Sequence, residues 1–241
     1  MIRGVLYERN GTLFVVKDFS DLIQKHIATI GIWEPDLVDL LKSISNQINE
    51  KKGKCHLVNI GAHIGTVCIA CANHFSRITA FEPVKSTFDH LNLHRTLNEI
   101  THMKTYNVAL SDSHHEAKIV FNTKNTGGCH IVSDYEVKNN IRHAQNYIIN
   151  ETVNCVPMDS IDFEDTIDVL LVDIEGHDEK FIQGAEQTIK KHLPILIMEI
   201  WTDSKRKYEN MNTTQSETIQ RIVSLGYKTV KKINHDTFIF L

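Results

Sequence analysis

The chain has 241 residues, of which 41% are hydrophobic and 23% charged, and its net charge is -4 at pH 7. These are the values of an ordinary globular protein, and the lack of a basic excess argues against a nucleic-acid partner. No run of eighteen apolar residues occurs, so we expect no membrane span, and the first residues lack the apolar core of a signal peptide. Five cysteines without framework spacing favour a reduced, cytoplasmic protein.

The N-terminal part predicts a hairpin followed by two helices. Asn10-Gly11 lies between the apolar-rich arms of residues 5–16, and this dipeptide favours a type I′ turn because both of its residues accept a positive φ. Helices are expected over 18–30 and 35–50. We interpret residues 1–53 as an appendage to a core over residues 54–241, within one domain.

In the core, apolar strands alternate with helical patterns. This alternation predicts a parallel sheet that is covered by helices on both faces. The last two strands, 227–233 and 236–241, are expected to form an antiparallel pair on that sheet. The other expected strands are 57–61, 77–82, 104–110, 168–174 and 194–201, and the expected helices are 64–75, 84–98, 178–191 and 213–225.

Residues 111–157 interrupt this alternation. They are polar, contain several histidines and the run TGGCH at 126–130, and show weak strand patterns near 117–122 and 151–156. A segment of this length inside a compact domain usually has a function. It follows the third strand, on the carboxyl side of the sheet where ligands bind, so we interpret it as an insertion or lid.

Two short segments indicate a nucleotide-binding unit. LVNIGAHIGT at 57–66 is an apolar run that breaks into Gly61 and Gly65, and AFEP at 80–83 ends a second apolar run in Glu82. A strand, a glycine turn, a helix and a strand ending in an acid are typical of adenosine-containing cofactors, because the acid accepts both ribose hydroxyls.

The glycine spacing separates the two cofactors that compete for such a unit. A nicotinamide dinucleotide calls for G-x-G-x-x-G, whose second glycine makes room for a pyrophosphate. Here Ala62 and His63 follow Gly61, and the next glycine is Gly65. This wider turn suits a ligand without a pyrophosphate, and together with the closing antiparallel strands it favours S-adenosyl-L-methionine.

Seven blocks resemble the FkbM family of S-adenosylmethionine-dependent methyltransferases, in the family's order. The resemblance implies a doubly wound, seven-stranded, mostly parallel sheet of the class I methyltransferase type, with an antiparallel C-terminal hairpin. The blocks are GIWEP (31–35), VNIGAHIGT (58–66), AFEP (80–83), NVALSD (107–112), VPMDSID (156–162), VDIEGHD (172–178) and PILIMEI (194–200). Three positions depart from the family's usual residues, with Asn59 for Asp, His63 for Asn and Leu171 for Lys.

The resemblance assigns the cofactor contacts to the carboxyl ends of the first three core strands. Gly61 and Gly65 shape the loop around the methionine moiety, and Glu82 binds the ribose hydroxyls. Asn59 still accepts a hydrogen bond there, but it carries no charge for the cofactor's ammonium. The remaining expected contacts are Ala62, His63, Pro83, Val108 and Ala109.

The acceptor side is expected at the ends of the fourth and fifth strands. Asp173 and Glu175 have the alternating spacing of one strand face and so point to one site if the strand continues that far. We expect Asp173 or His177 to accept the proton of a hydroxyl, with Glu175 and Glu199 orienting the acceptor. The alternative is that Glu175 and Glu199 cap loops or helix ends.

A divalent cation is a second explanation for the acids, although we do not favour it. Asp173, Glu199 and a nearby histidine offer oxygen and nitrogen ligands, but no ligand spacing is fixed. Cys68 and Cys71 form C-x-x-C in an apolar context and are interpreted as buried small residues. His90 and His94 are interpreted as a solvated helix face, and His114, His115 and His130 receive no role.

These patterns favour an S-adenosylmethionine-dependent O-methyltransferase. The family resemblance implies a sugar or glycan hydroxyl as the acceptor, and lipid, polyketide or amine acceptors remain alternatives. A nicotinamide-dependent oxidoreductase and a non-catalytic cofactor-binding module are the rivals from other classes. The resemblance also leaves a homodimer open, because the family often pairs through appended elements.

Overall fold

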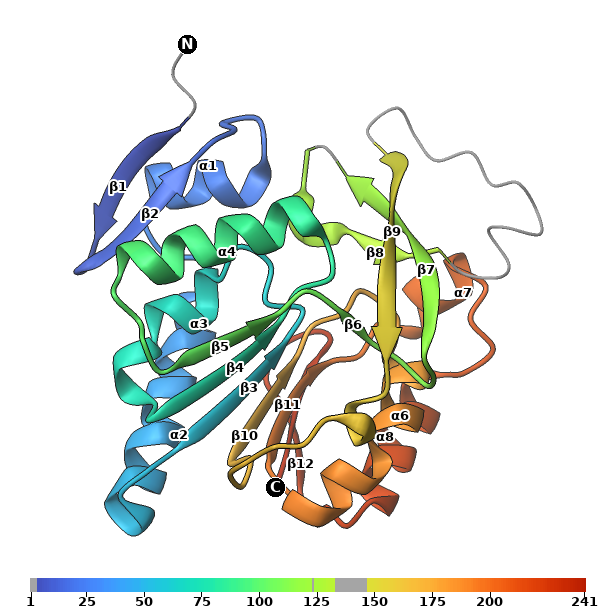
Figure 1. Ribbon diagram of the computed structural model, residues 1–241. Helices are drawn as coiled ribbons and strands as arrows, with labels where there is room; N and C mark the ends of the chain where they lie inside the picture. The colour runs from blue at the N-terminus through green and yellow to red at the C-terminus, as the bar shows by residue number, and fades with distance from the viewer. Residues whose placement is uncertain (1–3, 123, 133–146) are drawn as a thin grey trace.

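The computed structural model describes residues 4–122, 124–132 and 147–241. Among these residues, seven strands form one sheet in the order β12-β13-β11-β10-β3-β4-β5 (Figure 1). The five strands from β11 to β5 are parallel, and β13 pairs antiparallel with both β11 and β12. The strands are β3 (His56–Ile60), β4 (Arg77–Phe81), β5 (Met103–Tyr106), β10 (Val169–Val172), β11 (Ile195–Glu199), β12 (Val230–Lys232) and β13 (Thr237–Phe240).

Helices cover both faces of this sheet (Figure 1). Alternate residues of β3 separate the two cores: Leu57 packs with α2, α3 and α4, whereas Val58 packs with α6 and α8. This is the doubly wound arrangement expected from the sequence. The helices are α2 (Pro35–Lys52), α3 (Thr66–Ala70), α4 (Lys85–Leu97), α6 (Asp178–His192), α7 (Asp203–Tyr208) and α8 (Gln215–Ser224), of which α7 was not expected.

The expected N-terminal hairpin is formed by β1 (Val5–Arg9) and β2 (Thr12–Val16), and the helix α1 (Leu22–Thr29) follows it. Asn10 has φ 50 and Gly11 has φ 76, which is the pair of positive angles that a type I′ turn requires. Figure 1 places this hairpin across α4, away from the central sheet.

The interpretation of His90 and His94 as a solvated face was wrong, because these side chains hold the hairpin. His90 Nε2 donates to the carbonyl of Val15 at 2.7 Å, and the backbone N–H of Val15 donates to His94 Nε2 at 2.9 Å. One turn further along α4, Asn98 exchanges hydrogen bonds with both backbone groups of Leu13. One stripe of α4 therefore satisfies the free edge of β2.

Two predicted elements end four or five residues before their expected C-terminal ends. The strand over 104–110 ends at Tyr106, because the side chain of Asn107 donates to the carbonyls of Glu82 and Pro83 and turns the chain away. The helix over 64–75 ends at Ala70, and the carbonyl of His74 instead accepts hydrogen bonds from two side chains of α2.

The chain beyond Asn107 enters a second, four-stranded sheet with the order β6-β9-β7-β8. Its long strands β7 and β9 contain the weak patterns near 117–122 and 151–156, so strands were correctly expected there. Part of residues 111–157 lies outside the described residues. The strands are β6 (Ala109–Leu110), β7 (His115–Asn122), β8 (His130–Ile131) and β9 (Tyr147–Val156).

Cys68 and Cys71 are buried in the α2–α4 core and form no disulfide, as expected for small apolar residues. Burial raises the pKa of both thiols, which keeps them protonated and unreactive. No helix among the described residues has the length and apolar character needed to cross a membrane.

Candidate functional site

A cavity of about 310 Å³ lies at the carboxyl ends of the parallel strands. Its walls come from the loops after β3, β4, β10 and β11, from residues 125–131, and from Trp33 and Glu34 at the start of α2. Twelve of the thirteen residues expected at the site line it: Asn59, Gly61, Ala62, His63, Glu82, Pro83, Val108, Ala109, Asp173, Glu175, His177 and Glu199.

The glycine loop is shaped by two close approaches. Gly61 has φ 76, and a Cβ atom there would lie 1.7 Å from the carbonyl oxygen of Asp173. Gly65 has φ 86 and is the remaining expected residue: it faces Leu91 and Ile69 behind the loop instead of the cavity. Gly61 therefore brings the loop against the acceptor side, and Gly65 allows α3 to pack on α4.

Glu82 is 6% exposed and binds backbone N–H groups of the glycine loop and of its own segment after β4. One carboxylate oxygen accepts the N–H of His63 at 2.9 Å, and the other accepts the N–H of Val84 at 2.9 Å. Burial raises the pKa of Glu82 to about 7, although these two hydrogen bonds oppose the shift. Each oxygen keeps a second lone pair for a ribose hydroxyl, so the geometry fits the expected role.

Four further residues expected to contact the cofactor lie around the same cavity. Val108 and Ala109 flank the cavity where the chain leaves the main sheet, because Asn107 diverts it there. Asn59, at 3% exposure, lies at the end of β3 and lines the cavity next to Gly61. Burial lowers the pKa of His63 to about 4, so its ring is neutral at pH 7.

Asp173 and Glu199 share a hydrogen bond across the ends of β10 and β11, and Glu199 is its donor. Protein surrounds Asp173 on most sides, yet the carboxylate stays accessible through the cavity. Burial raises both pKa values, and the charge of Asp173 raises that of Glu199 further. Glu199 therefore keeps its proton at neutral pH, and Asp173 is the carboxylate of the pair that ionises first, with a pKa of about 7.

Glu175 reaches the same place by a turn, which corrects the expected strand face. β10 ends at Val172, and Glu175 has φ 48, followed by Gly176 at φ 85. Its side chain accepts from Lys205 Nζ at 3.3 Å, and that ammonium lies 3.7 Å above the ring of Trp201. A non-glycine residue in this left-handed region is held there by its surroundings.

His177 lines the cavity, but its Nε2 atom is engaged in a hydrogen bond to Ser111. Ser111 donates its hydroxyl proton to Asp112, so its oxygen accepts from His177 Nε2 at 2.9 Å. Burial lowers the pKa of His177 to about 4. This makes His177 a weaker base at neutral pH than the Asp173 carboxylate.

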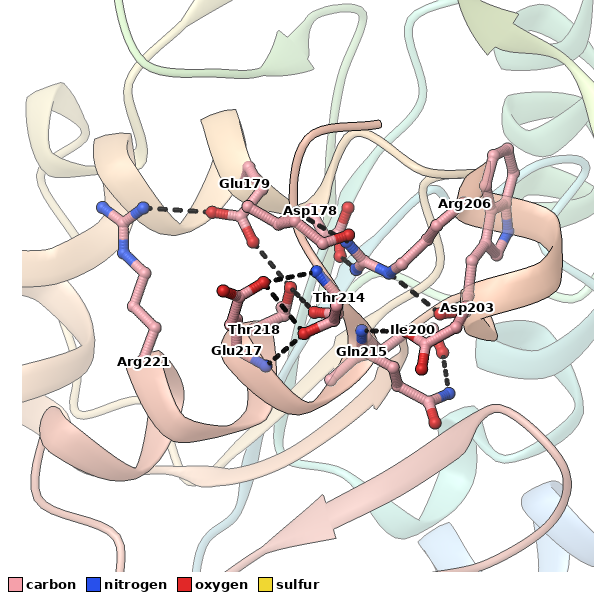
Figure 2. Close-up of polar contacts among 12 residues, drawn as sticks. Asp178, Glu179, Ile200, Asp203, Arg206, Thr214, Gln215, Glu217, Thr218 and Arg221 are labelled. Carbon is pink, nitrogen blue, oxygen red and sulfur yellow. Dashed lines mark hydrogen bonds and ion pairs between the residues drawn. The ribbon is translucent and has the colours of Figure 1, made fainter. Parts of the chain in front are cut away.

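The loops that carry these acids are fastened to each other by a buried ion pair. Arg206 of α7 pairs with Asp178 at the start of α6, and both residues are 1% exposed (Figure 2). The same guanidinium donates to the carbonyl of Trp201 at 2.9 Å. Gln215 of α8 binds the carbonyl of Ile200 at 2.7 Å. The positions of Glu175 and Glu199 therefore depend on α6, α7 and α8.

The three acids also meet the geometric condition for a cation. One oxygen from each of Asp173, Glu175 and Glu199 lies within 4.8 Å of the others. The set differs from the expected one, because Glu175 takes the place of the histidine. Carboxylate oxygens suit magnesium, calcium or manganese, but the shared proton and Lys205 already balance part of this charge.

Sequence reasoning missed several residues at the site. Glu34 lines the cavity with φ 50, and its pKa is raised by burial and by the nearby acidic groups of Glu199 and Asp236. Its place directly before Pro35, in a block that resembled the family, was an available signal. Thr126 belongs to the TGGCH run but received no role of its own. Only the position of Asp236 in the last turn could have indicated it.

Comparison with known proteins identifies the family. The family model described as the methyltransferase FkbM domain matches residues 59–229. This chain belongs to the FkbM methyltransferase family. It therefore contains a methyltransferase domain, which argues against the oxidoreductase alternative. No curated protein matches the sequence.

Solved structures agree with this FkbM fold. The methyltransferase FkbM from Methylobacillus flagellatus KT is 16% identical, with a TM-score of 0.50, over 78% of this chain and 43% of the other. Monomeric WbdD is 8% identical, with a TM-score of 0.51, over 90% of this chain and 43% of the other. The FkbM chain described here thus spans less than half of either protein, and the likeness concerns the fold.

Proposed function

We propose that this protein transfers the methyl group of S-adenosylmethionine to a hydroxyl group, with a sugar or glycan as the acceptor. The observation that carries this proposal is the Asp173–Glu199 pair, which leaves one ionised carboxylate facing the cavity. A hydroxyl is a poor nucleophile at neutral pH and benefits from such a base. The acceptor class itself rests on the resemblance to the FkbM family.

The cofactor would lie between the glycine loop and Glu82. Gly61, Ala62 and His63 would surround its methionine part, Glu82 would bind the ribose hydroxyls, and Val108 and Ala109 would flank the adenine. The sulfonium supplies the methyl group. Since the carbonyl of Asp173 packs against Gly61, the base and the cofactor loop keep a fixed separation, which favours an in-line displacement.

In the proposed reaction, Asp173 accepts the hydroxyl proton while the acceptor oxygen bonds to the methyl carbon. The carbon–sulfur bond breaks and its electron pair stays on sulfur, so S-adenosylhomocysteine leaves as a neutral thioether. Glu199 stabilises the Asp173 carboxylate by its hydrogen bond, and Glu175 orients the acceptor. His177 remains an alternative base.

An amine acceptor is the second candidate, and the charge of the cavity favours it. Six acids line the cavity, whereas the described lining residues include no lysine or arginine. This imbalance attracts a cationic group. The acids are Glu34, Glu82, Asp173, Glu175, Glu199 and Asp236.

A methyl-transfer assay distinguishes the candidates. Formation of S-adenosylhomocysteine would be measured with neutral sugars, amino sugars, simple amines and lipid alcohols, and the methylated atom would be located by NMR. We expect turnover with a sugar hydroxyl, whereas methylated nitrogen would favour the second candidate. Calorimetry with S-adenosylhomocysteine and NADH is the control: failure to bind S-adenosylhomocysteine would contradict both. We also place the protein in the cytoplasm, which its free cysteines support.

A further inference from the structure

The side chain of Asp21 joins the N-terminal helix α1 to residues 124–128. It is fully buried, and one oxygen accepts the N–H of Gln24 at 2.9 Å, which caps α1. The other oxygen accepts both the N–H and the hydroxyl of Thr126, at 2.7 and 2.9 Å. The N–H of Leu22 donates to the carbonyl of Lys124 at 2.9 Å, so the two segments are joined at several points.

Thr126 extends this connection to the cofactor loop. Its hydroxyl proton is used by Asp21, so its oxygen accepts a hydrogen bond from His63 Nε2 at 2.8 Å. This direction fixes the proton of the neutral imidazole on Nε2. His63 is thereby held through its side chain as well as through its backbone contact with Glu82.

His63 lies in the glycine loop with a strained backbone conformation. His63 has φ 51, a backbone conformation that a non-glycine residue keeps only where its surroundings hold it. In this conformation its N–H donates to Glu82 at 2.9 Å. His63, Glu82 and Thr126 all line the cavity.

The fit between the two segments leaves little room for another arrangement. A Cβ atom on Gly127 would lie 2.4 Å from Ile23 Cδ1, and both residues line the cavity. The backbone of Gly127 therefore lies directly against Ile23 of α1, and a movement of Thr126 away from α1 breaks its hydrogen bonds to Asp21.

We propose that Asp21 and Thr126 are positioning residues for the cofactor: through the side chain of His63 they hold its N–H, and with it Glu82, in the geometry that receives the ribose hydroxyls. The N-terminal segment is then part of the cofactor site as well as a wall of the acceptor site. This inference rests on the proposed function, because it takes Glu82 as the ribose ligand.

The test replaces the Thr126 hydroxyl while keeping the shape of the side chain. Thr126→Val removes the hydrogen bonds of the hydroxyl to both His63 and Asp21 but leaves the backbone N–H on Asp21, and Thr126→Ser restores the hydroxyl. Thr29→Val is the matched control, since the Thr29 hydroxyl is exposed and binds only carbonyls of its own helix. Calorimetry with S-adenosylhomocysteine should give a dissociation constant about three- to tenfold higher for Thr126→Val, and wild-type values for the other two variants.

A double-mutant cycle separates positioning from a general structural role. His63→Asn cannot reach Thr126, so Thr126→Val should add nothing in that background. Unchanged affinity in Thr126→Val, or a lower unfolding midpoint without a change in affinity, would overturn the inference. So would effects that add in the double variant.

The tautomer of His63 provides a readout that needs no ligand. Nitrogen chemical shifts should report a proton on Nε2 in the wild type and its redistribution in Thr126→Val. A wild-type protein with this tautomer that fails to bind S-adenosylhomocysteine would overturn the proposed function alone. A wild-type proton on Nδ1 would overturn the positioning chain, whatever the affinity.

Discussion

The carbonyl oxygen of Asp173 occupies the space that a Cβ atom on Gly61 would need, 1.7 Å from the ideal Cβ position. Gly61 follows β3 and Asp173 follows β10, and these two strands are neighbours in the sheet. The cofactor loop and the proposed base are therefore in direct backbone contact. A side chain at position 61 separates them or displaces one loop.

Gly61→Ala should lower the free energy of unfolding by more than about 3 kcal/mol, because backbone strain and a backbone clash add. Gly11→Ala is a closely matched control: Gly11 has the same φ of +76, but nothing lies within 4 Å of its Cβ position. That variant should lose only about 1–2 kcal/mol. Urea unfolding of both proteins measures the difference, and equal losses would show that the Asp173 contact is unimportant.

Asp173 and Glu199 should respond differently to the same kind of substitution. Glu199 already carries the proton, so Glu199→Gln retains a neutral hydrogen-bond donor and should keep most activity. Asp173→Asn removes the ionised carboxylate and should lower kcat by about 10²–10⁴, with unchanged binding of S-adenosylhomocysteine. The reverse result would identify Glu199 as the base.

The same pair predicts the pH dependence of turnover. Burial raises the pKa of Asp173 to about 7, and the base works only when ionised. The rate constant kcat should therefore fall as the pH drops below about 7 and level off above it. A profile that stays flat down to pH 5, with the fold intact, would contradict a catalytic Asp173 carboxylate.

Glu82→Gln should weaken binding of S-adenosylhomocysteine about 10- to 150-fold, because hydrogen bonds to the charged carboxylate become neutral ones. Glu116→Gln is the matched control, since Glu116 is exposed on β7. Because the pKa of Glu82 is raised to about 7, wild-type affinity should also decline below that pH. Calorimetry at pH 6 and pH 8 measures both the effect of the substitution and the pH dependence of the affinity. An affinity of Glu82→Gln for S-adenosylhomocysteine equal to that of the wild type would exclude Glu82 as the ribose ligand.

Removal of one partner of the Arg206–Asp178 ion pair should lower the free energy of unfolding by about 3–5 kcal/mol, because the other charge stays buried without a partner. Arg206→Met tests this by chemical unfolding. The double variant Asp178→Asn/Arg206→Met should recover part of the loss. Arg221→Met provides the control at the edge of the same network, where the guanidinium is one-third exposed (Figure 2); a similar cost for Arg221→Met would contradict the role of burial.

His94→Leu should lower the free energy of unfolding, measured by urea unfolding, by about 2–5 kcal/mol at pH 8. Two backbone groups, the N–H of Val15 and the carbonyl of Ile64, lose their hydrogen-bond partner in this variant. Burial lowers the pKa of His94 in the fold. Below about pH 6.5 the unfolded chain therefore binds a proton that the folded chain does not, and wild-type stability falls relative to the variant. The cost should shrink by up to about 1.4 kcal/mol per pH unit, and a cost independent of pH would contradict a neutral His94.

Local patterns were sufficient for the sheet and for the residues that line the cavity at its carboxyl edge. The short apolar runs before Gly61 and Glu82 form buried parallel strands, and the strand order brings their ends to one cavity. Glu175 shows the limit of such reasoning. Its spacing from Asp173 suggested one strand face, but a left-handed turn at Glu175 and Gly176 brings the two acids together.

Contacts between distant segments could not be predicted from local patterns. His90 and His94 occur in a polar helix and would face solvent if the hairpin did not pack there. Asp21 and Thr126 meet only because α1 and the segment after β7 converge on the cofactor loop. Only the tertiary structure brings such residues together, and no local pattern in a single sequence identifies them as contacts.

His90, His94 and Asn98 form hydrogen bonds to backbone groups of Leu13 and Val15 in β2, and the ring of His94 also packs edge-on against Phe14. Attachment of the hairpin is therefore largely independent of the side chains at Leu13 and Val15. Substitutions at these two positions can accumulate without detaching the hairpin, whereas Phe14 and Val16 are buried in the core and are constrained in their side chains. A one-residue insertion before Val15 would place the wrong peptide groups opposite the stripe, so we expect the length of the hairpin to be more constrained than the sequence at Leu13 and Val15.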